Sequence, residues 1–239
     1  MTGIHRRRLK GKSGLVTLEL CAGAGGQAIG LERAGIDHVG LVEIDARACL
    51  TLRQNRPKWN VIEQDLNTFD AAAFTGTDIV SAGLPCPPFS VAGKQLGTLD
   101  ERNLFPSLIR VVDQVRPRAV VVENVRGILD AVFEDYREHV AQQLRKLGYQ
   151  PGWHLMSASE FGVPQLRPRV VFVAVRKSYA EHFSWPDPRT MKFSLLGSIL
   201  RCVRLLRAGL LSPGSELRGF KSLRETPDLC LSEGLAVGI

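Results

Sequence analysis

The chain has 239 residues, of which 44% are hydrophobic and 23% are charged, the balance of a globular protein. No run approaches the ~18 apolar residues of a membrane-spanning helix, and the basic N-terminus lacks the apolar core of a secretory signal. The five cysteines are widely spaced and include no CxxC pair, which argues against a disulfide framework or a zinc site and is typical of a reducing cytoplasm.

The net charge of +7 comes from the two ends of the chain. Residues 1–14 include five basic and no acidic residues, whereas residues 15–189 include 19 basic and 20 acidic ones. We expect residues 1–13 to form a basic, disordered tail, although such a tail could also hold a nucleic-acid backbone without sequence preference.

Short apolar runs alternate with amphipathic stretches from the first strand onward, which predicts an α/β domain over residues 14–186. Its uninterrupted apolar strands indicate a mostly parallel sheet covered on both faces. Strands are expected at 15–20, 39–43, 61–62, 78–82, 119–122, 153–157 and 170–175, and helices at 26–34, 45–54, 102–115 and 134–147.

The pattern changes in the C-terminal segment, residues 187–239. Apolar residues at helical spacing predict a helix over 191–211, which would cover the domain or, in a sharper interpretation, lie on a membrane surface. Residues 212–239 show no clear period.

A cysteine between prolines is the most informative local feature. Cys86 lies in the run Gly83-Leu84-Pro85-Cys86-Pro87-Pro88-Phe89-Ser90, directly after an expected strand. The prolines stiffen the backbone, and the carboxyl ends of strands in such sheets are where ligands bind. Cys86 is therefore either a nucleophile or a small packing residue in a rigid loop.

A glycine-rich turn, residues 21–26, separates the first strand from the first helix, where glycines let the backbone approach a ligand. Glu43 ends the second strand, a position from which an acid accepts hydrogen bonds from ribose hydroxyls. Together they fit a nicotinamide dinucleotide or S-adenosylmethionine. Asp65 is a candidate for an adenine amino group or, equally, a turn or helix-cap aspartate.

Two further groups are expected at strand ends. Glu123 follows the apolar run 119–122, and Arg167 and Arg169 precede the last strand. Singly, the acid could be a helix N-cap and the arginines surface charges. Together with Cys86 they make a nucleophile, an acid and a cationic clamp.

These motifs, in this order, resemble those of DNA (cytosine-5)-methyltransferases: residues 20–26, Glu43, Asp65, Pro85-Cys86-Pro87-Pro88-Phe89-Ser90, Glu123-Asn124-Val125 and Gln165-x-Arg167-x-Arg169. The resemblance covers about residues 14–186. It implies the three-layer αβα, Rossmann-like fold of S-adenosylmethionine-dependent methyltransferases, with double-stranded DNA as partner and with no metal and no membrane.

The resemblance also implies roles for individual residues. Cys86 would add to carbon 6 of a flipped-out cytosine, Glu123 would hydrogen-bond the ring, and Arg169 with Arg167 would hold its O2 side. Ser90 and Gln95 would lie in the loop that closes over the base. The cofactor-binding residues would be Leu20, Cys21, Ala22, Gly23, Gly25, Gly26, Glu43, Ile44, Asp65, Leu66, Pro85 and Leu104.

The resemblance stops near residue 186, because residues 187–239 match neither a target-recognition domain nor the segment that usually follows it. We expect a truncated chain, a chain that needs a second polypeptide for target recognition, or a degenerate one. The alternatives are an inactive remnant that binds S-adenosylmethionine or DNA, and a nicotinamide-dependent oxidoreductase. A restriction-modification enzyme of this kind belongs in a prokaryotic cytosol or nucleoid.

Overall fold

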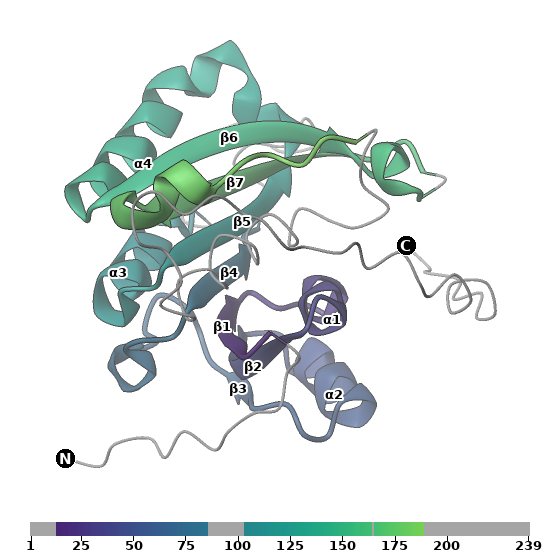
Figure 1. Ribbon diagram of the computed structural model, residues 1–239. Helices are drawn as coiled ribbons and strands as arrows, with labels where there is room; N and C mark the ends of the chain where they lie inside the picture. The colour runs from purple at the N-terminus through teal and green to yellow at the C-terminus, as the bar shows by residue number, and fades with distance from the viewer. Residues whose placement is uncertain (1–12, 86–102, 164, 189–239) are drawn as a thin grey trace, which may run out of the picture.

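A seven-stranded sheet forms the centre of the protein in a computed structural model that describes residues 13–85, 103–163 and 165–188 (Figure 1). The strand order is β3-β2-β1-β4-β5-β7-β6. Neighbouring strands among β1 to β5 are parallel, whereas β7 runs antiparallel to β5 and β6. The strands are β1 Leu15–Leu20, β2 Ile36–Glu43, β3 Val61–Glu63, β4 Ile79–Gly83, β5 Ala119–Val125, β6 Tyr149–Ser157 and β7 Pro168–Arg176.

Helices cover both faces of this sheet (Figure 1). On one face α1 (Gly26–Arg33) and α2 (Ala46–Asn55) pack against Leu41 of β2. On the other, α3 (Phe105–Val115) and α4 (Glu134–Lys146) join the largest apolar cluster. The predicted three-layer αβα fold with a mostly parallel sheet is confirmed. Short 3₁₀ turns occupy Ala72–Phe74, Arg126–Leu129, Ala131–Phe133, Ala158–Phe161 and Lys177–His182.

The sequence explains the helices of the second face. The buried residues of α3 fall at helical spacing, and a proline opens its first turn, where no intrahelical N–H bond is lost. Helix α4 has acids in its first turn and bases in its last, which complements the helix dipole. Gly148 follows it with φ +90°, a left-handed conformation that ends a helix at little cost.

The antiparallel strands are longer than the sequence pattern predicts. Strand β6 begins at Tyr149 rather than 153, although Pro151 and Gly152 are poor strand formers. The pairing of Tyr149 with Arg176 through Ser157 with Pro168 overrides that preference, and β6 is an edge strand, where proline is tolerated. Strand β5 likewise runs to Val125, so Glu123 lies inside the strand instead of after it.

Several expectations fall on other parts of the chain. Apart from Ser13, the basic tail 1–13 lies outside the described residues, as does the helix expected over 191–211. The domain boundaries at 14 and 186 therefore remain predictions. Among the described residues, none of the helices has the length and hydropathy required to cross a membrane.

Candidate functional site

A pocket of about 230 Å³ opens at the carboxyl ends of the strands on the β1–β3 side of the sheet. Two carboxylates face it, and no lysine or arginine belongs to its described lining. The lining residues are Cys21, Val42, Glu43, Ile44, Gln64, Asp65, Leu66, Asn67, Pro85 and Leu104.

The turn between β1 and α1 forms one wall of this pocket. Cys21, Gly23 and Gly25 all have left-handed backbone, with φ of 52°, 54° and 93°. Gly25 is the N-cap of α1, and a Cβ there would lie 2.7 Å from Cδ2 of Leu52. A glycine is therefore required at position 25 both for its conformation and for the space beneath it.

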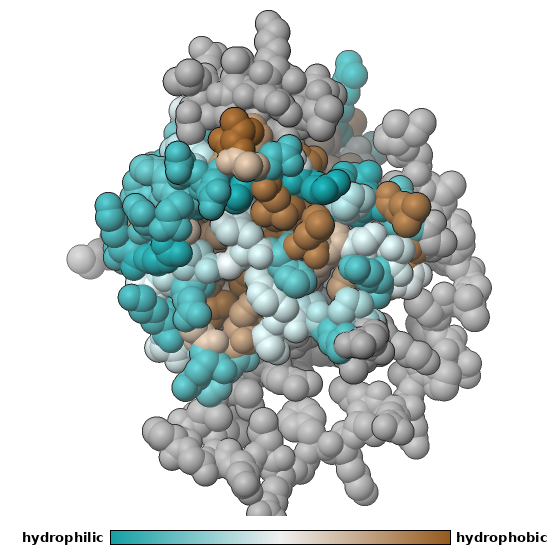
Figure 2. Space-filling view, turned by 90° about the horizontal axis from the view of Figure 1, so that it is seen from above, coloured by the Kyte–Doolittle hydropathy of each residue, from teal (hydrophilic) through white to brown (hydrophobic). Residues whose placement is uncertain are grey.

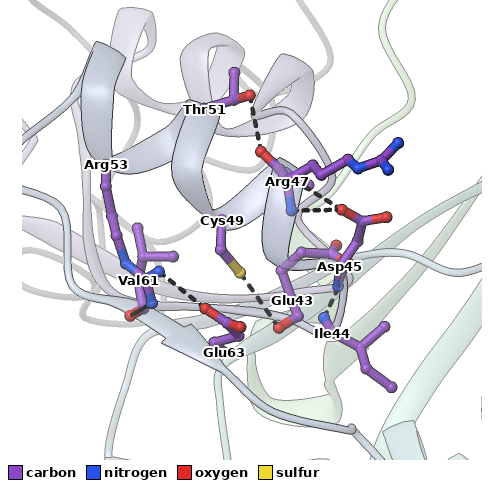
Figure 3. Close-up of polar contacts among 10 residues, drawn as sticks. Glu43, Ile44, Asp45, Arg47, Cys49, Thr51, Arg53, Val61 and Glu63 are labelled. Carbon is purple, nitrogen blue, oxygen red and sulfur yellow. Dashed lines mark hydrogen bonds and ion pairs between the residues drawn. The ribbon is translucent and has the colours of Figure 1, made fainter.

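Glu43 is held by backbone amides on both of its carboxylate oxygens. Oε2 accepts a bond of 2.7 Å from the N–H of Gly23. Oε1 accepts bonds of 2.9 Å from the N–H groups of Ile44 and Asp45 (Figure 3). The carboxylate thus ties the glycine turn to the end of β2. With four lone-pair sites and three of them used, it can still accept one hydrogen bond from a ligand.

Asp65 serves as a turn residue and also lines the pocket. Its Oδ1 accepts a 2.9 Å bond from the N–H of Asn67, and its carbonyl accepts one of 3.1 Å from Thr68. Oδ2 makes no hydrogen bond within the described residues. Asp65 can therefore be a turn residue and also bind an adenine amino group, the two roles that the sequence left open.

The Cys21 thiol faces these acids and stays protonated. Burial, together with the nearby carboxylates of Glu43 and Asp65, raises the pKa of Cys21 to about 12. Cys21 is therefore a neutral part of the pocket wall and not a nucleophile.

A second cluster lies at the end of β5. Arg169 Nε and Glu123 Oε1 are 2.6 Å apart, and their side chains are 27% and 43% exposed. Gly83 pairs with Glu123 across β4 and β5, and Arg169 pairs with Val125 across β5 and β7. The ion pair therefore lies beside Gly83 at the end of β4. Pro85, which lines the pocket, follows Gly83 by two residues.

Of the other expected catalytic and loop residues, the structure describes Arg167 alone. Arg167 is exposed, and among the described contacts only its backbone is bonded, to Gln165 and Ala158. Cys86, Ser90 and Gln95 lie outside the described residues.

Seven of the twelve expected cofactor residues line the pocket: Cys21, Glu43, Ile44, Asp65, Leu66, Pro85 and Leu104. The other five, Leu20, Ala22, Gly23, Gly25 and Gly26, belong to the end of β1 and the glycine turn. Sequence reasoning missed Val42, Gln64 and Asn67, although the first two precede expected residues directly.

The exposed apolar side chains are scattered. Seen from above, hydrophobic residues form small separate patches among hydrophilic ones (Figure 2). Leu166, beside Arg167, is 90% exposed. The described large apolar residues with high exposure are Ile44, Leu50, Val132, Leu155, Val163 and Leu166.

Comparison with known proteins identifies the family. A family model described as C-5 cytosine-specific DNA methylase matches residues 15–209. The Type II methyltransferase M.NgoMIV of Neisseria gonorrhoeae is 54% identical over 184 residues, which are 77% of this chain and 59% of that protein. The Type II methyltransferase M.AquIA of Picosynechococcus sp. is 33% identical, over 72% of this chain and 75% of its own length.

A solved structure agrees with these sequence matches. A DNMT2 mutant of Spodoptera frugiperda has a TM-score of 0.57 and 27% identity, over 72% of this chain and 52% of that one. These are S-adenosylmethionine-dependent methyltransferases. The chain spans 59% of M.NgoMIV, the relative with the higher identity.

The pocket suits S-adenosylmethionine better than a nicotinamide dinucleotide. Its acceptors, Glu43 and Asp65, fit ribose hydroxyls and an adenine amino group, and the exposed side chain of Ile44 offers an apolar surface to a base. A pyrophosphate would need positive charge or a free helix N-terminus. Here two carboxylates, and no described lysine or arginine, line the pocket.

Proposed function

The chain belongs to the C-5 cytosine-specific DNA methylase family, and on that premise we propose that it methylates carbon 5 of cytosine in DNA. S-adenosylmethionine supplies the methyl group. The observation that carries the proposal is the short distance along one sheet edge between a cofactor-type pocket and the Glu123–Arg169 pair.

Cytosine needs a nucleophile because its carbon 5 is unreactive until a group adds to carbon 6. In the proposed mechanism the Cys86 thiolate forms the S–C6 bond, and the electron pair of the C5–C6 double bond moves into the ring. Carbon 5 then takes the methyl group. Loss of the carbon-5 proton and elimination of Cys86 restore the double bond.

The Glu123–Arg169 pair would stabilise the charge that the addition places on the ring. Glu123 would hydrogen-bond N3 and the amino group of the base, while Arg169 would bind O2. The 2.6 Å contact orients the two side chains relative to each other, and their partial exposure leaves both reachable from solvent. Arg167, on the same segment, would be the second cation of this clamp.

Double-stranded DNA would be the substrate, and its target base would be flipped out, because no group of the site can reach cytosine inside a duplex. The exposed Leu166 beside Arg167 is an apolar side chain available to that surface. The Type II methyltransferase relatives support a role in restriction-modification, which would place the protein in a prokaryotic cytosol or nucleoid.

We further propose that a second polypeptide supplies target recognition. The chain spans 59% of M.NgoMIV, but 75% of M.AquIA, so a methyltransferase relative of similar extent exists. A truncated chain is the competing explanation. Co-expression with the reading frame that follows the gene, and then pull-down through this chain, would separate the two explanations.

A covalent trap tests the function. DNA containing 5-fluorocytosine cannot lose its carbon-5 substituent, so a mechanism through Cys86 leaves the protein attached to the DNA once methyl transfer has occurred. We expect an adduct with the wild-type chain, with its partner where one co-purifies, and none with Cys86→Ala. Absence of any adduct in the presence of S-adenosylmethionine would refute the activity.

An inactive cofactor-binding remnant is the second candidate, supported by a pocket whose described lining includes neither Glu123 nor Arg169. It predicts calorimetric binding of S-adenosylmethionine that survives Cys86→Ala, with no methyl transfer under any condition. Methyl transfer by the wild-type chain would exclude it.

A further inference from the structure

A buried polar pair with no role in the proposed mechanism lies behind the glycine turn. Glu19 of β1 is fully buried and His38 of β2 is 8% exposed. His38 Nε2 and Glu19 Oε2 are 3.1 Å apart. Burying two such groups is costly, so their presence behind the glycine turn calls for an explanation.

An irregularity in the sheet brings the pair together. Thr17 pairs with His38, but the next residue, Leu18, pairs with Gly40, so Val39 is an extra residue in β2. Leu41 faces the α1–α2 side of the sheet. If side chains alternated strictly along β2, His38, three residues earlier, would face the other side. The extra residue reverses that alternation and places His38 on the side of Glu19.

The pair is connected to the glycine turn through a tryptophan. The ring centroids of His38 and Trp59 are 4.9 Å apart. A Cβ on Gly25 would lie 3.4 Å from Cζ3 of Trp59, so this ring lies directly under the N-cap of α1. Contacts therefore run without interruption from Glu19 through His38 and Trp59 to the turn.

The start of α1 also affects the pKa of Glu19. Burial raises the pKa of Glu19, while His38 and the backbone N–H of Ala28 act in the opposite direction. Ala28 is the third residue of α1, and the N–H groups of a first helical turn have no partner within the helix. No hydrogen bond joins Glu19 to α1, however, because Oε1 of Glu19, like Nδ1 of His38, has no hydrogen-bond partner among the described residues.

We propose that Glu19 is a positioning residue for the cofactor turn, oriented by His38. Its carboxyl group fixes the imidazole of His38, which in turn contacts Trp59 beneath Gly25. Through these two rings Glu19 supports the turn in which Cys21, Gly23 and Gly25 have left-handed backbone. The inference rests on the proposed function only in taking S-adenosylmethionine as the ligand of the pocket.

The first test compares two buried polar residues of the same strand, Glu19 and Thr17. The Thr17 hydroxyl is bonded to Ser81 at 3.1 Å and is not connected to the turn. In Glu19→Gln an uncharged amide replaces the carboxyl group that contacts His38, so we expect faster amide hydrogen exchange in residues 22–30. S-adenosylmethionine should bind roughly tenfold more weakly in calorimetry, the usual effect of one lost bond to a charged group.

The control Thr17→Val should leave both readouts within about twofold of wild type, although it too removes a buried hydrogen bond. Equal exchange rates in the two variants would overturn the proposal. The exchange measurement uses the free protein, so it remains decisive even where the wild-type chain fails to bind S-adenosylmethionine, a result that would count against the proposed function instead.

Two substitutions of His38 separate positioning from general stability. His38→Gln keeps a donor for Glu19, whereas His38→Phe fills similar space without one. We expect His38→Gln to retain wild-type exchange and affinity, and His38→Phe to reproduce Glu19→Gln. The same loss in both His38 variants would refute the role of the imidazole as donor.

Discussion

Replacing Glu43 with glutamine should separate cofactor binding from folding more clearly than any other change in the pocket. The carboxylate accepts three backbone N–H bonds, of which the one from Gly23, at 2.7 Å, crosses from β2 to the glycine turn. An amide can satisfy the two donors at Ile44 and Asp45 through its oxygen. Its NH₂ group then faces the Gly23 N–H, so that bond is replaced by a repulsive contact.

The expected loss follows from this geometry. A hydrogen bond to a charged group contributes about 1.5–3 kcal/mol, and the ligand also loses its remaining charged acceptor. We therefore expect S-adenosylmethionine to bind about 10- to 100-fold more weakly to Glu43→Gln in isothermal titration calorimetry. Urea unfolding should stay cooperative, and the free energy of unfolding should fall by less than the free energy of binding, because two of the three hydrogen bonds remain.

Glu63 provides a matched control. It is the register partner of Glu43 on the neighbouring strand, but its ion pair with Arg53 is exposed. Exposed pairs contribute about 0–1 kcal/mol, so Glu63→Gln should leave the affinity unchanged. An affinity for Glu43→Gln within twofold of wild type, or an equal loss in Glu63→Gln, would refute the assignment of Glu43 to the ligand.

Three further predictions concern the same pocket. Gly25→Ala should lower the free energy of unfolding by about 1–3 kcal/mol in urea, because the new Cβ would lie 2.7 Å from Leu52 at a φ of +93°. The pKa of Cys21 is raised to about 12 from 9.0, so iodoacetamide should alkylate this thiol about 1000-fold more slowly at pH 8 than it alkylates an ordinary thiol. Peptide mass spectrometry measures the rate, which should rise as the pH rises through 12. Asp65→Asn should keep the turn, because the amide oxygen can still accept the hydrogen bond from Asn67. It should weaken S-adenosylmethionine binding about tenfold in calorimetry, because the new NH₂ group would face the adenine amino group. Unchanged affinity would show that Asp65 is a turn residue only.

The sequence predicts those parts of the site that depend on one strand and the turn after it. The apolar run of β1 and the glycines after it are local signals, and so is the acid at the end of β2. Parallel strands bring their carboxyl ends to the same edge, which is why Glu43 could be expected beside Gly23, 20 residues away. The bonds from three amides to that one carboxylate could not be foreseen from the pattern.

The Glu123–Arg169 pair depends on strand pairing that the pattern did not show. An alternating strand–helix sequence predicts parallel neighbours, yet β7 enters the sheet antiparallel beside β5. Only that direction pairs Arg169 with Val125 and brings its guanidinium to Glu123. Sequence reasoning placed both side chains at strand ends, whereas the structure places both inside strands and joins them by register.

Glu19 and His38 were missed for a different physical reason. Side chains alternate between the two faces of a strand, so the face of each residue is predicted by counting from a neighbour. A single extra residue reverses the predicted face of every residue beyond it. Val39 is such a residue, so His38 faces the α1–α2 side of the sheet although its distance from Leu41 in sequence predicts the opposite face. An irregularity of one residue in β2 thus determines whether the buried carboxylate beneath the cofactor turn has a partner.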